Sequence, residues 1–235
     1  MKRAEFLRGL YAGIPICLGY LSVSFAFGIF AVESGLSLLS ALLLSMTCVT
    51  SAGQLAAVPI IAGAGGFFEL ALSQLVINLR YSLMSVSLSQ KLDHSIKLFD
   101  RFALAFVNTD EVFAVASSQR SVNKWFFYGL ILTPWAGWSL GTLLGAAAGN
   151  ILPAMVTSAL GIAIYGMFIA IVVPEAKRSR PTALCVGIAV FLSCLFYWVP
   201  WLQQIPSGFT VIICAVAASA IMAWLAPIEQ EVEHA

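Results

Sequence analysis

Charged residues are scarce in this 235-residue chain. Asp, Glu, Lys and Arg make up 10% of it, against 60% hydrophobic residues. Soluble domains average about 25% charged residues, so a soluble fold could not bury this much apolar surface. The composition predicts an all-α integral membrane protein organised as a single transmembrane domain over residues 1–235. The formal net charge of +1 argues against nucleic acid as a partner.

Several chemical motifs are also lacking. The two histidines, His94 and His234, fall in predicted extramembrane segments, and the five cysteines show no paired spacing. No phosphate-binding glycine loop, metalloprotease helix or nucleophile elbow occurs. We therefore expect no enzymatic activity, no catalytic residues, no cofactor and no metal. Any transport is not expected to be driven by ATP through this chain alone.

What the sequence does contain is a series of long apolar stretches. About 20 apolar residues cross the hydrocarbon core as a helix, because each residue adds about 1.5 Å and the core is about 30 Å thick. Six stretches meet this length: 10–31, 67–89, 125–148, 153–173, 181–199 and 208–226. Two others, 36–62 and 102–118, are apolar but have polar residues at their centres.

The basic residues choose between two topologies. Apart from Arg80, every Lys and Arg can be placed on one side of the membrane, which is cytoplasmic by the positive-inside rule. If all eight stretches cross, the basic loop 90–101 falls outside. If 36–62 and 102–118 enter and return, every basic loop and both termini are cytoplasmic. The second count, six spans with two broken or re-entrant segments, is preferred, and the first stays open.

Both unusual stretches contain a signal for a helix start. Ser51 precedes Gln54 by three residues, and Asn108 precedes Glu111 by three, which is the capping-box spacing. A helix that starts inside an apolar stretch implies that another has just ended. Opposed broken helices near the midplane, often related by an inverted repeat, form the binding sites of many secondary transporters. The alternative is that Ser51 and Asn108 merely cap kinks.

Arg80 lies deep in the span 67–89, where a charge costs about 3 kcal/mol on insertion scales. It therefore needs a partner, and Asp110 or Glu111 is the expected one. A static ion pair and a gating role both remain open. The same span carries a polar stripe that either joins helices or lines a solute path: Gln74, Asn78, Ser82, Ser85 and Ser89.

Glycines recur every four residues in the span 125–148 and just after it. This spacing allows two helices to approach closely, either within the chain or against a second subunit. The stripe consists of Gly137, Gly141, Gly145 and Gly149.

At these positions the sequence resembles the AzlC-type branched-chain amino acid permease family, the large subunit of branched-chain amino acid exporters. The segments that carry the resemblance are 12–15, 26–28, 52–54, 77–80, 108–111, 138–145 and 167–170. The chain departs from common family patterns at Leu55, where members often have an aromatic residue, and at Tyr81, where they often have His. The resemblance covers residues 10–175 well and the rest weakly.

The resemblance implies export of hydrophobic amino acids such as valine, leucine, isoleucine or methionine. It also implies a location in the bacterial inner membrane, within the lipid bilayer, and a small AzlD-like membrane subunit as partner.

A zwitterionic substrate needs a positive end for its carboxylate, an acceptor for its ammonium group and an apolar pocket. Half-helix N–H groups, a carboxyl group and the surrounding helices are expected to supply these, with an acid exchanging a proton. The candidate substrate-binding residues are Ser51, Gly53, Gln54, Asn78, Asn108 and Thr109, and the coupling or gating candidates are Arg80, Asp110 and Glu111. The rival hypothesis is a non-transporting structural or regulatory subunit that assembles through the glycine stripe.

Overall fold

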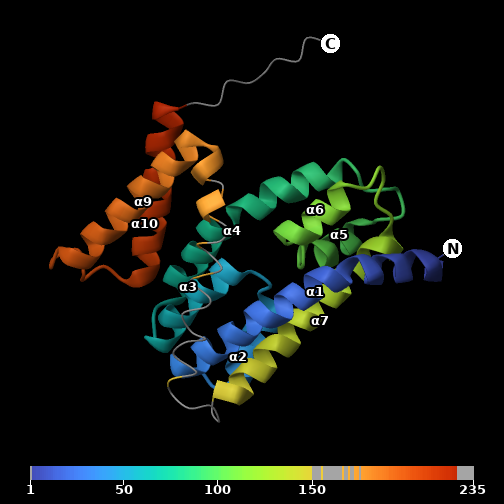
Figure 1. Ribbon diagram of the computed structural model, residues 1–235, viewed down its shortest axis with the longest axis horizontal. Helices are drawn as coiled ribbons and strands as arrows, with labels where there is room; N and C mark the ends of the chain where they lie inside the picture. The colour runs from blue at the N-terminus through green and yellow to red at the C-terminus, as the bar shows by residue number, and fades with distance from the viewer. Residues whose placement is uncertain are drawn as a thin grey trace.

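The computed structural model describes residues 2–149, 155, 166, 169, 172–174 and 176–226. Every named element within these residues is a helix, and a single β-bridge joins Leu92 to Val122. The elements, drawn in Figure 1, are α1 (Lys2–Glu33), α2 (Leu38–Thr47), α3 (Ser51–Ala62), α4 (Phe67–Ser89), α5 (Leu98–Ala105), α6 (Asp110–Ser117), α7 (Lys124–Gly149), α9 (Arg180–Trp198) and α10 (Ser207–Leu225). The prediction of an all-α membrane fold is confirmed. Most of the predicted span 153–173 lies outside the described residues.

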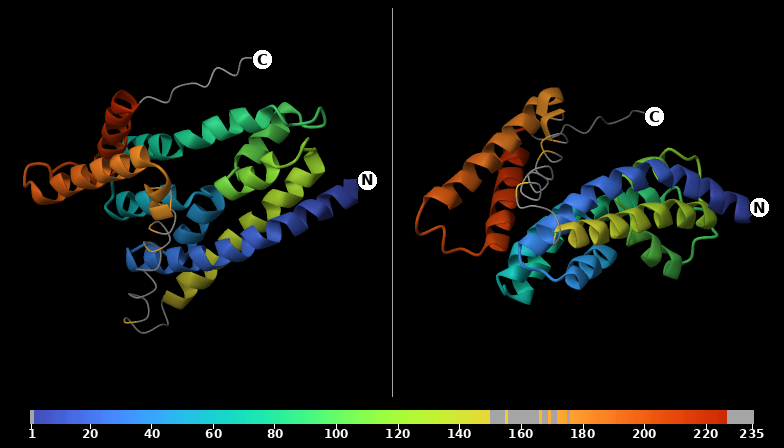
Figure 2. Two further views of the ribbon diagram at one scale, coloured as in Figure 1. Left: turned by 45° about the horizontal axis from the view of Figure 1, so that its top comes forward. Right: turned by 60° about the horizontal axis from the view of Figure 1, so that its bottom comes forward.

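Helices α1 and α7 pack closely side by side, and they run parallel (Figures 1 and 2). Gly9 of α1 packs at Phe126 near the start of α7, and Gly28 packs between Thr142 and Ala146 near its end. The backbones approach so closely that a Cβ added at Gly145 would lie 1.9 Å from the carbonyl oxygen of Phe25. The predicted glycine stripe is therefore used mainly within the chain, against α1.

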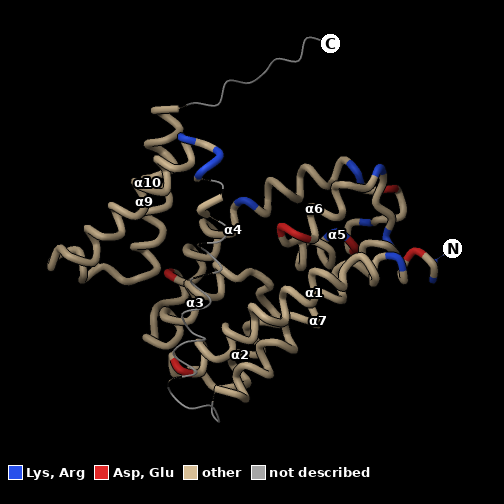
Figure 3. The backbone as a smooth tube through the Cα atoms, in the orientation of Figure 1, with Lys and Arg blue, Asp and Glu red and all other residues tan. Residues whose placement is uncertain are grey.

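The pair defines two ends of the molecule. We call the end at which α1 and α7 begin the basic end, because most Lys and Arg residues gather there, while a separate basic group lies at the start of α9 (Figure 3). The opposite end, where α1 finishes at Glu33, is called the far end.

The segment between α1 and α4 is a hairpin that enters from the far end. Helix α2 starts there, where Ala41 belongs to one buried cluster with Ala31 and Ala146. It descends until the Met46 carbonyl accepts a hydrogen bond from Trp135 Nε1 at 3.1 Å. Helix α3 then returns, so that Val58 packs in the same far-end cluster as Ala31. We call α2 and α3 the first hairpin.

The segment after α4 is a second hairpin, which enters from the basic end. At its entrance Asp100 of α5 pairs with Lys124 at 2.6 Å. The hairpin turns near the middle of α1, where Thr109 is hydrogen-bonded to Tyr20. Helix α6 then returns to the basic end, where the Ser117 carbonyl accepts a hydrogen bond from Lys91. Neither hairpin crosses the molecule, so the eight-crossing alternative is wrong.

Helix α4 runs antiparallel to α1, from the far end to the basic end (Figure 1). The chain thus repeats one unit, a long helix followed by a re-entrant hairpin, in two opposite orientations. The first unit is α1 to α3 and the second is α4 to α6. This geometry supports the predicted inverted repeat.

Four helices in the described part of the chain are long and apolar enough to cross a membrane: α1, α7, α9 and α10. Helix α4 has 23 residues, which is long enough, but its polar stripe lowers its hydropathy and it is not among the four. Its polar residues must therefore face protein or water.

Candidate functional site

The breaks in the two hairpins meet near the middle of the α1–α7 pair. In the first hairpin, helix α3 begins after Thr50, whose backbone is extended and whose hydroxyl accepts a hydrogen bond from the Gly53 N–H at 3.4 Å. The prediction of Ser51 as the cap is wrong by one residue. The helix start itself is confirmed, because a hydroxyl at the break does satisfy one of the orphan N–H groups.

Gln54 does not reach back to the cap. It is fully buried, its Nε2 donates to Ser45 Oγ at 3.0 Å, and its Oε1 accepts from Trp138 Nε1 at 3.0 Å. The predicted capping box is therefore absent, because the amide joins α3 to α2 and α7 instead. A direct contact between Gln54 and substrate stays a prediction, and its amide already has two partners.

In the second hairpin, helix α6 begins after Thr109, not after Asn108 as predicted. No side chain caps this start. The Asn108 amide turns away and donates to Ser85 Oγ of α4 at 3.2 Å, while Glu111 accepts from the Tyr20 hydroxyl. The capping box is again wrong, because both of its predicted members bind other helices.

Each long helix contributes a tyrosine to the break of the other unit. The Tyr20 hydroxyl of α1 is 2.7 Å from Thr109 Oγ1, and the Tyr81 hydroxyl of α4 is 3.5 Å from Thr50 Oγ1. These two contacts are reciprocal across the inverted repeat. The sequence interpretation missed Tyr20, Thr50 and Tyr81 as site residues. A tyrosine inside an apolar span was the available signal, because a buried hydroxyl normally finds a partner.

The predicted ion pair of Arg80 is confirmed. Arg80 Nη1 lies 2.8 Å from Asp110 Oδ2, its Nη2 donates to the Tyr81 hydroxyl at 3.1 Å, and its guanidinium lies 4.8 Å from the centre of the Tyr81 ring. The Arg80 and Asp110 side chains are 55% and 46% exposed, so the pair lies at a surface of the protein rather than in its packed core. With Glu111, the cluster holds one positive and two negative formal charges.

These groups line a cavity of about 590 Å³, which we call the central cavity. Its polar wall combines the starts of α3 and α6 with the Arg80–Asp110 pair, and its apolar wall comes from α1, α7 and the first break. The lining residues that carry the argument are Ile16, Val23, Ser51, Ala52, Glu111 and Trp138. Helix starts present free N–H groups and the positive end of the helix dipole. The cavity therefore has a complementary wall for an anionic group, for a cationic group and for an apolar side chain.

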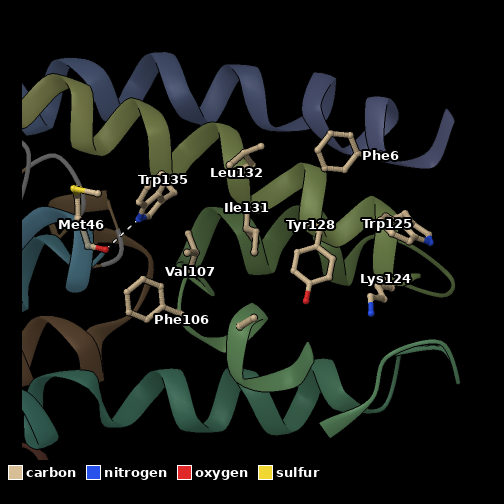
Figure 4. Close-up of a pocket in the computed structure, with 11 residues that line it drawn as sticks. Phe6, Met46, Phe106, Val107, Lys124, Trp125, Tyr128, Ile131, Leu132 and Trp135 are labelled. Atoms are coloured by element: carbon tan, nitrogen blue, oxygen red, sulfur yellow. Dashed lines mark hydrogen bonds between the residues drawn. The ribbon is translucent and has the colours of Figure 1, made fainter. Parts of the chain in front are cut away.

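A second cavity of about 590 Å³ has a different character (Figure 4). It runs along α7 between α5 and α2, and its labelled side chains are almost all apolar or aromatic, including Phe106, Tyr128 and Trp135. Phe106 is 50% exposed there. Such a groove suits acyl chains or another apolar helix, and it offers little to the two charges of an amino acid.

The polar stripe of α4 holds the first hairpin in place. Gln74 Nε2 donates to the Gly53 carbonyl at 2.8 Å, and Asn78 Nδ2 donates to Gln74 Oε1 at 3.2 Å. A Cβ at position 53 would lie 2.6 Å from Gln74 Oε1, so the Gln74 side chain would have to shift and its bond to the Gly53 carbonyl would be disturbed. Of the predicted substrate-binding residues, Ser51 and Thr109 line the central cavity, whereas Gly53 and Gln54 are not among its lining residues. Asn78 and Asn108 line a smaller adjoining cavity.

Outside the membrane-embedded breaks, Asp100 anchors the basic end of the second hairpin. It accepts hydrogen bonds from Lys124, the Lys97 N–H and Tyr128. The hydrogen bond from Lys124 is the main cause that lowers the pKa of Asp100 to about 2. This carboxylate therefore stays charged near neutral pH.

Within the described residues, no group of three or more His, Cys, Asp or Glu side chains is placed to hold a metal ion. The family model described as AzlC protein matches residues 15–152, more than half of the chain. The chain belongs to the AzlC family.

Relatives of this AzlC-family chain are also membrane proteins. It is 34% identical over 194 residues to a protein of Archaeoglobus fulgidus described as an uncharacterized membrane protein, covering 82% of this chain and 85% of the relative. It is 29% identical over 196 residues to the inner membrane protein YgaZ of Escherichia coli, covering 80% and 79%. A Helicobacter pylori membrane protein is 24% identical over 208 residues, covering 81% and 86%. No solved structure matches the chain.

Proposed function

We propose that this chain is the large subunit of a secondary transporter that exports branched-chain or other hydrophobic amino acids. The observation that carries the proposal is the central cavity, which lies where two re-entrant hairpins present their helix starts beside an ion pair. Secondary transporters commonly place their substrate sites at such interrupted helices. A cavity of about 590 Å³ also lies within the usual range for small-molecule sites.

The walls of the cavity suggest how a zwitterion binds. Its carboxylate meets the N–H groups of Ser51 and Ala52 at the start of α3, whose first turn contains no acidic residue. Its ammonium group meets Glu111, because Arg80 already neutralises Asp110. Its side chain rests on the apolar wall of Ile16, Val23 and Trp138. A branched aliphatic side chain gains the most from such a wall, since burial of apolar surface drives binding.

We further propose that the acid pair couples transport to protons. Protonation of one carboxyl releases Arg80 or the bound ammonium group, and the two hairpins then move relative to α1 and α7. The expected setting is a bacterial inner membrane, with the basic end and both termini in the cytoplasm and a small AzlD-like subunit as partner. The name of the Escherichia coli relative supports the inner-membrane location, and the collection of most Lys and Arg residues at one end supports the orientation.

The rival proposal, a structural or regulatory subunit without transport, relied on a glycine face available for assembly. That face packs against α1, with Gly137 against Cys17 and Gly141 against Leu21. The glycine spacing that favoured the rival proposal is therefore explained by the packing of α7 against α1 within the chain.

Efflux of labelled leucine from reconstituted vesicles tests the proposal. Vesicles would contain this chain alone or with the candidate small subunit, and we expect efflux that responds to a pH gradient. Asp110→Asn is expected to reduce efflux at least tenfold, whereas the matched variant Asp93→Asn, in the loop at the basic end, retains it. No efflux in either vesicle preparation would overturn transport, and unchanged efflux in Asp110→Asn would remove the acid from the mechanism.

A further inference from the structure

The two hairpin breaks present both kinds of helix end, and they present them to different cavities. The starts of α3 and α6 border the central cavity. The finishing ends of α2 and α5 border a smaller cavity of about 220 Å³, lined there by Thr47, Cys48, Ala105 and Phe106. The last carbonyls of a helix lack partners along the helix and form the negative end of its dipole. The small cavity is therefore suited to a cation, as the central cavity is to a carboxylate.

Two buried side-chain oxygens at the small cavity strengthen this contrast. Asn78 Oδ1 and Asn108 Oδ1 are both inaccessible to solvent and have no hydrogen-bond partner among the described residues. Asn108 is only 5% exposed. Both residues line the small cavity, and both side-chain nitrogens already donate hydrogen bonds, to Gln74 and to Ser85.

The orientation of the Asn78 amide is fixed by its neighbour. Gln74 donates through Nε2 to the Gly53 carbonyl, so its Oε1 must face the Asn78 nitrogen. The Asn78 oxygen is thereby left as an acceptor. Buried acceptors without partners are uncommon in native structures, and each needs a donor or a cation.

We propose that the small cavity binds a desolvated monovalent cation of the size of Na⁺. Its oxygen ligands are the two amides, threonine hydroxyls and carbonyls at the ends of α2 and α5. Oxygen ligands suit hard cations, and the absence of any carboxylate among the lining residues favours a single over a double charge. Carbonyls at unwound helix ends hold coupling ions in other secondary transporters.

The small cavity adjoins the central cavity, because Val49, Thr50, Tyr81 and Thr109 line both. A cation held there fixes the wall against which the amino acid binds. The role of the cation as a coupling ion rests on the proposed transport function. Binding of the cation to the protein does not depend on that function, and it can be measured without transport.

Thermal unfolding of the purified full chain in detergent, followed by tryptophan fluorescence, tests the site. Choline chloride would be replaced by NaCl, LiCl or KCl at constant ionic strength. At roughly ten times the Kd, Na⁺ is expected to raise the Tm by about 4 °C. Asn108→Leu and Asn78→Leu are each expected to lose this rise. Ser139→Ala is the matched control, because it removes another buried oxygen without a partner, on α7, and retains the rise.

Asn108→Leu decides the test if Asn78→Leu fails to fold. An equal Tm in every salt would overturn the proposal, as would a Na⁺-induced rise retained by Asn108→Leu. A third outcome is that leucine in choline chloride raises the Tm, that Na⁺ alone does not, and that Asn108→Leu abolishes the effect of leucine. That outcome would overturn the cation site and assign the cavity to the substrate ammonium group. A Na⁺-specific rise without efflux would leave the ion site standing and overturn only transport. Efflux without the rise would overturn only the ion site.

Discussion

The two inverted units share a topology but differ in packing and charge. In the first unit, α1 buries nine residues, mainly through its contact with α7. In the second, α4 buries only Glu69, Ser73 and Leu88. Arg80, Asp110 and Glu111 all belong to the second unit, whereas the break of the first unit has Ser51 and Ala52 where the second has two acids. The first unit therefore provides the frame, and the second carries the charges that we propose for coupling.

The largest effect is expected where the frame is tightest. Gly145→Ala places a Cβ 1.9 Å from the Phe25 carbonyl oxygen, and α1 and α7 must separate to accept it. Overpacking of this kind costs about 3 kcal/mol. Gly187→Ala is the control, since nothing lies within 4 Å of its Cβ. The Tm of both variants measures the difference, and equal Tm values would show that the α1–α7 contact is not the rigid part of the molecule.

The next prediction separates a structural from a coupling role for the ion pair. Arg80→Met is expected to lower the Tm, because it leaves Asp110 beside Glu111 without a counter-charge. Arg80→Met combined with Asp110→Leu is expected to recover most of the Tm, but not efflux, which stays at least tenfold below that of the parent. Recovery of both in the double variant would make the pair purely structural and remove the contrast between the units.

The reciprocal tyrosines test the symmetry directly. Tyr20→Phe removes bonds to Thr109 and to the Glu111 carboxylate, and is expected to cost about 2 kcal/mol, because hydrogen bonds to charged groups are stronger. Tyr81→Phe removes a long bond to Thr50 and one from Arg80, whose side chain is 55% exposed, so the expected cost is only about 1 kcal/mol. Denaturant unfolding of the two variants checks this order. A larger loss in Tyr81→Phe would mean that the second unit is the more constrained one.

The smallest effects are expected at the hairpin entrances. The second hairpin begins at the Asp100–Lys124 ion pair, and the first begins at Ser37, whose hydroxyl accepts from the Ser40 N–H at 3.1 Å. Ser37→Ala is expected to cost about 1 kcal/mol at any pH. Asp100→Asn is expected to lower the Tm only while the carboxyl is ionised. Because the folded pKa is lowered from 3.8 to about 2, this contribution is full above 3.8 and is lost as the pH falls toward 2. If the difference in Tm between Asp100→Asn and the parent does not narrow as the pH falls from 3.8 toward 2, the ionic role of Asp100 is contradicted.

The sequence was sufficient to place the breaks and the ion pair. Polar residues inside apolar stretches are costly, so 36–62 and 102–118 had to be irregular, and Arg80 had few possible partners. The individual caps were not predictable, because Thr50 and Ser51 both carry hydroxyls and only the backbone at the break selects between them. The Tyr20–Thr109 contact joins residues far apart in the chain, and it follows from the inverted arrangement rather than from local spacing.

The parallel course of α1 and α7 has a consequence for how the protein is made. Parallel neighbours cannot be joined by a short loop, so both hairpins and α4 are synthesised between them. Helix α1 is therefore synthesised well before α7, and Gly9, Gly13 and Gly28 lack their α7 contacts until α7 emerges from the ribosome. A chain interrupted before residue 124 would keep this face of α1 without the helix that covers it.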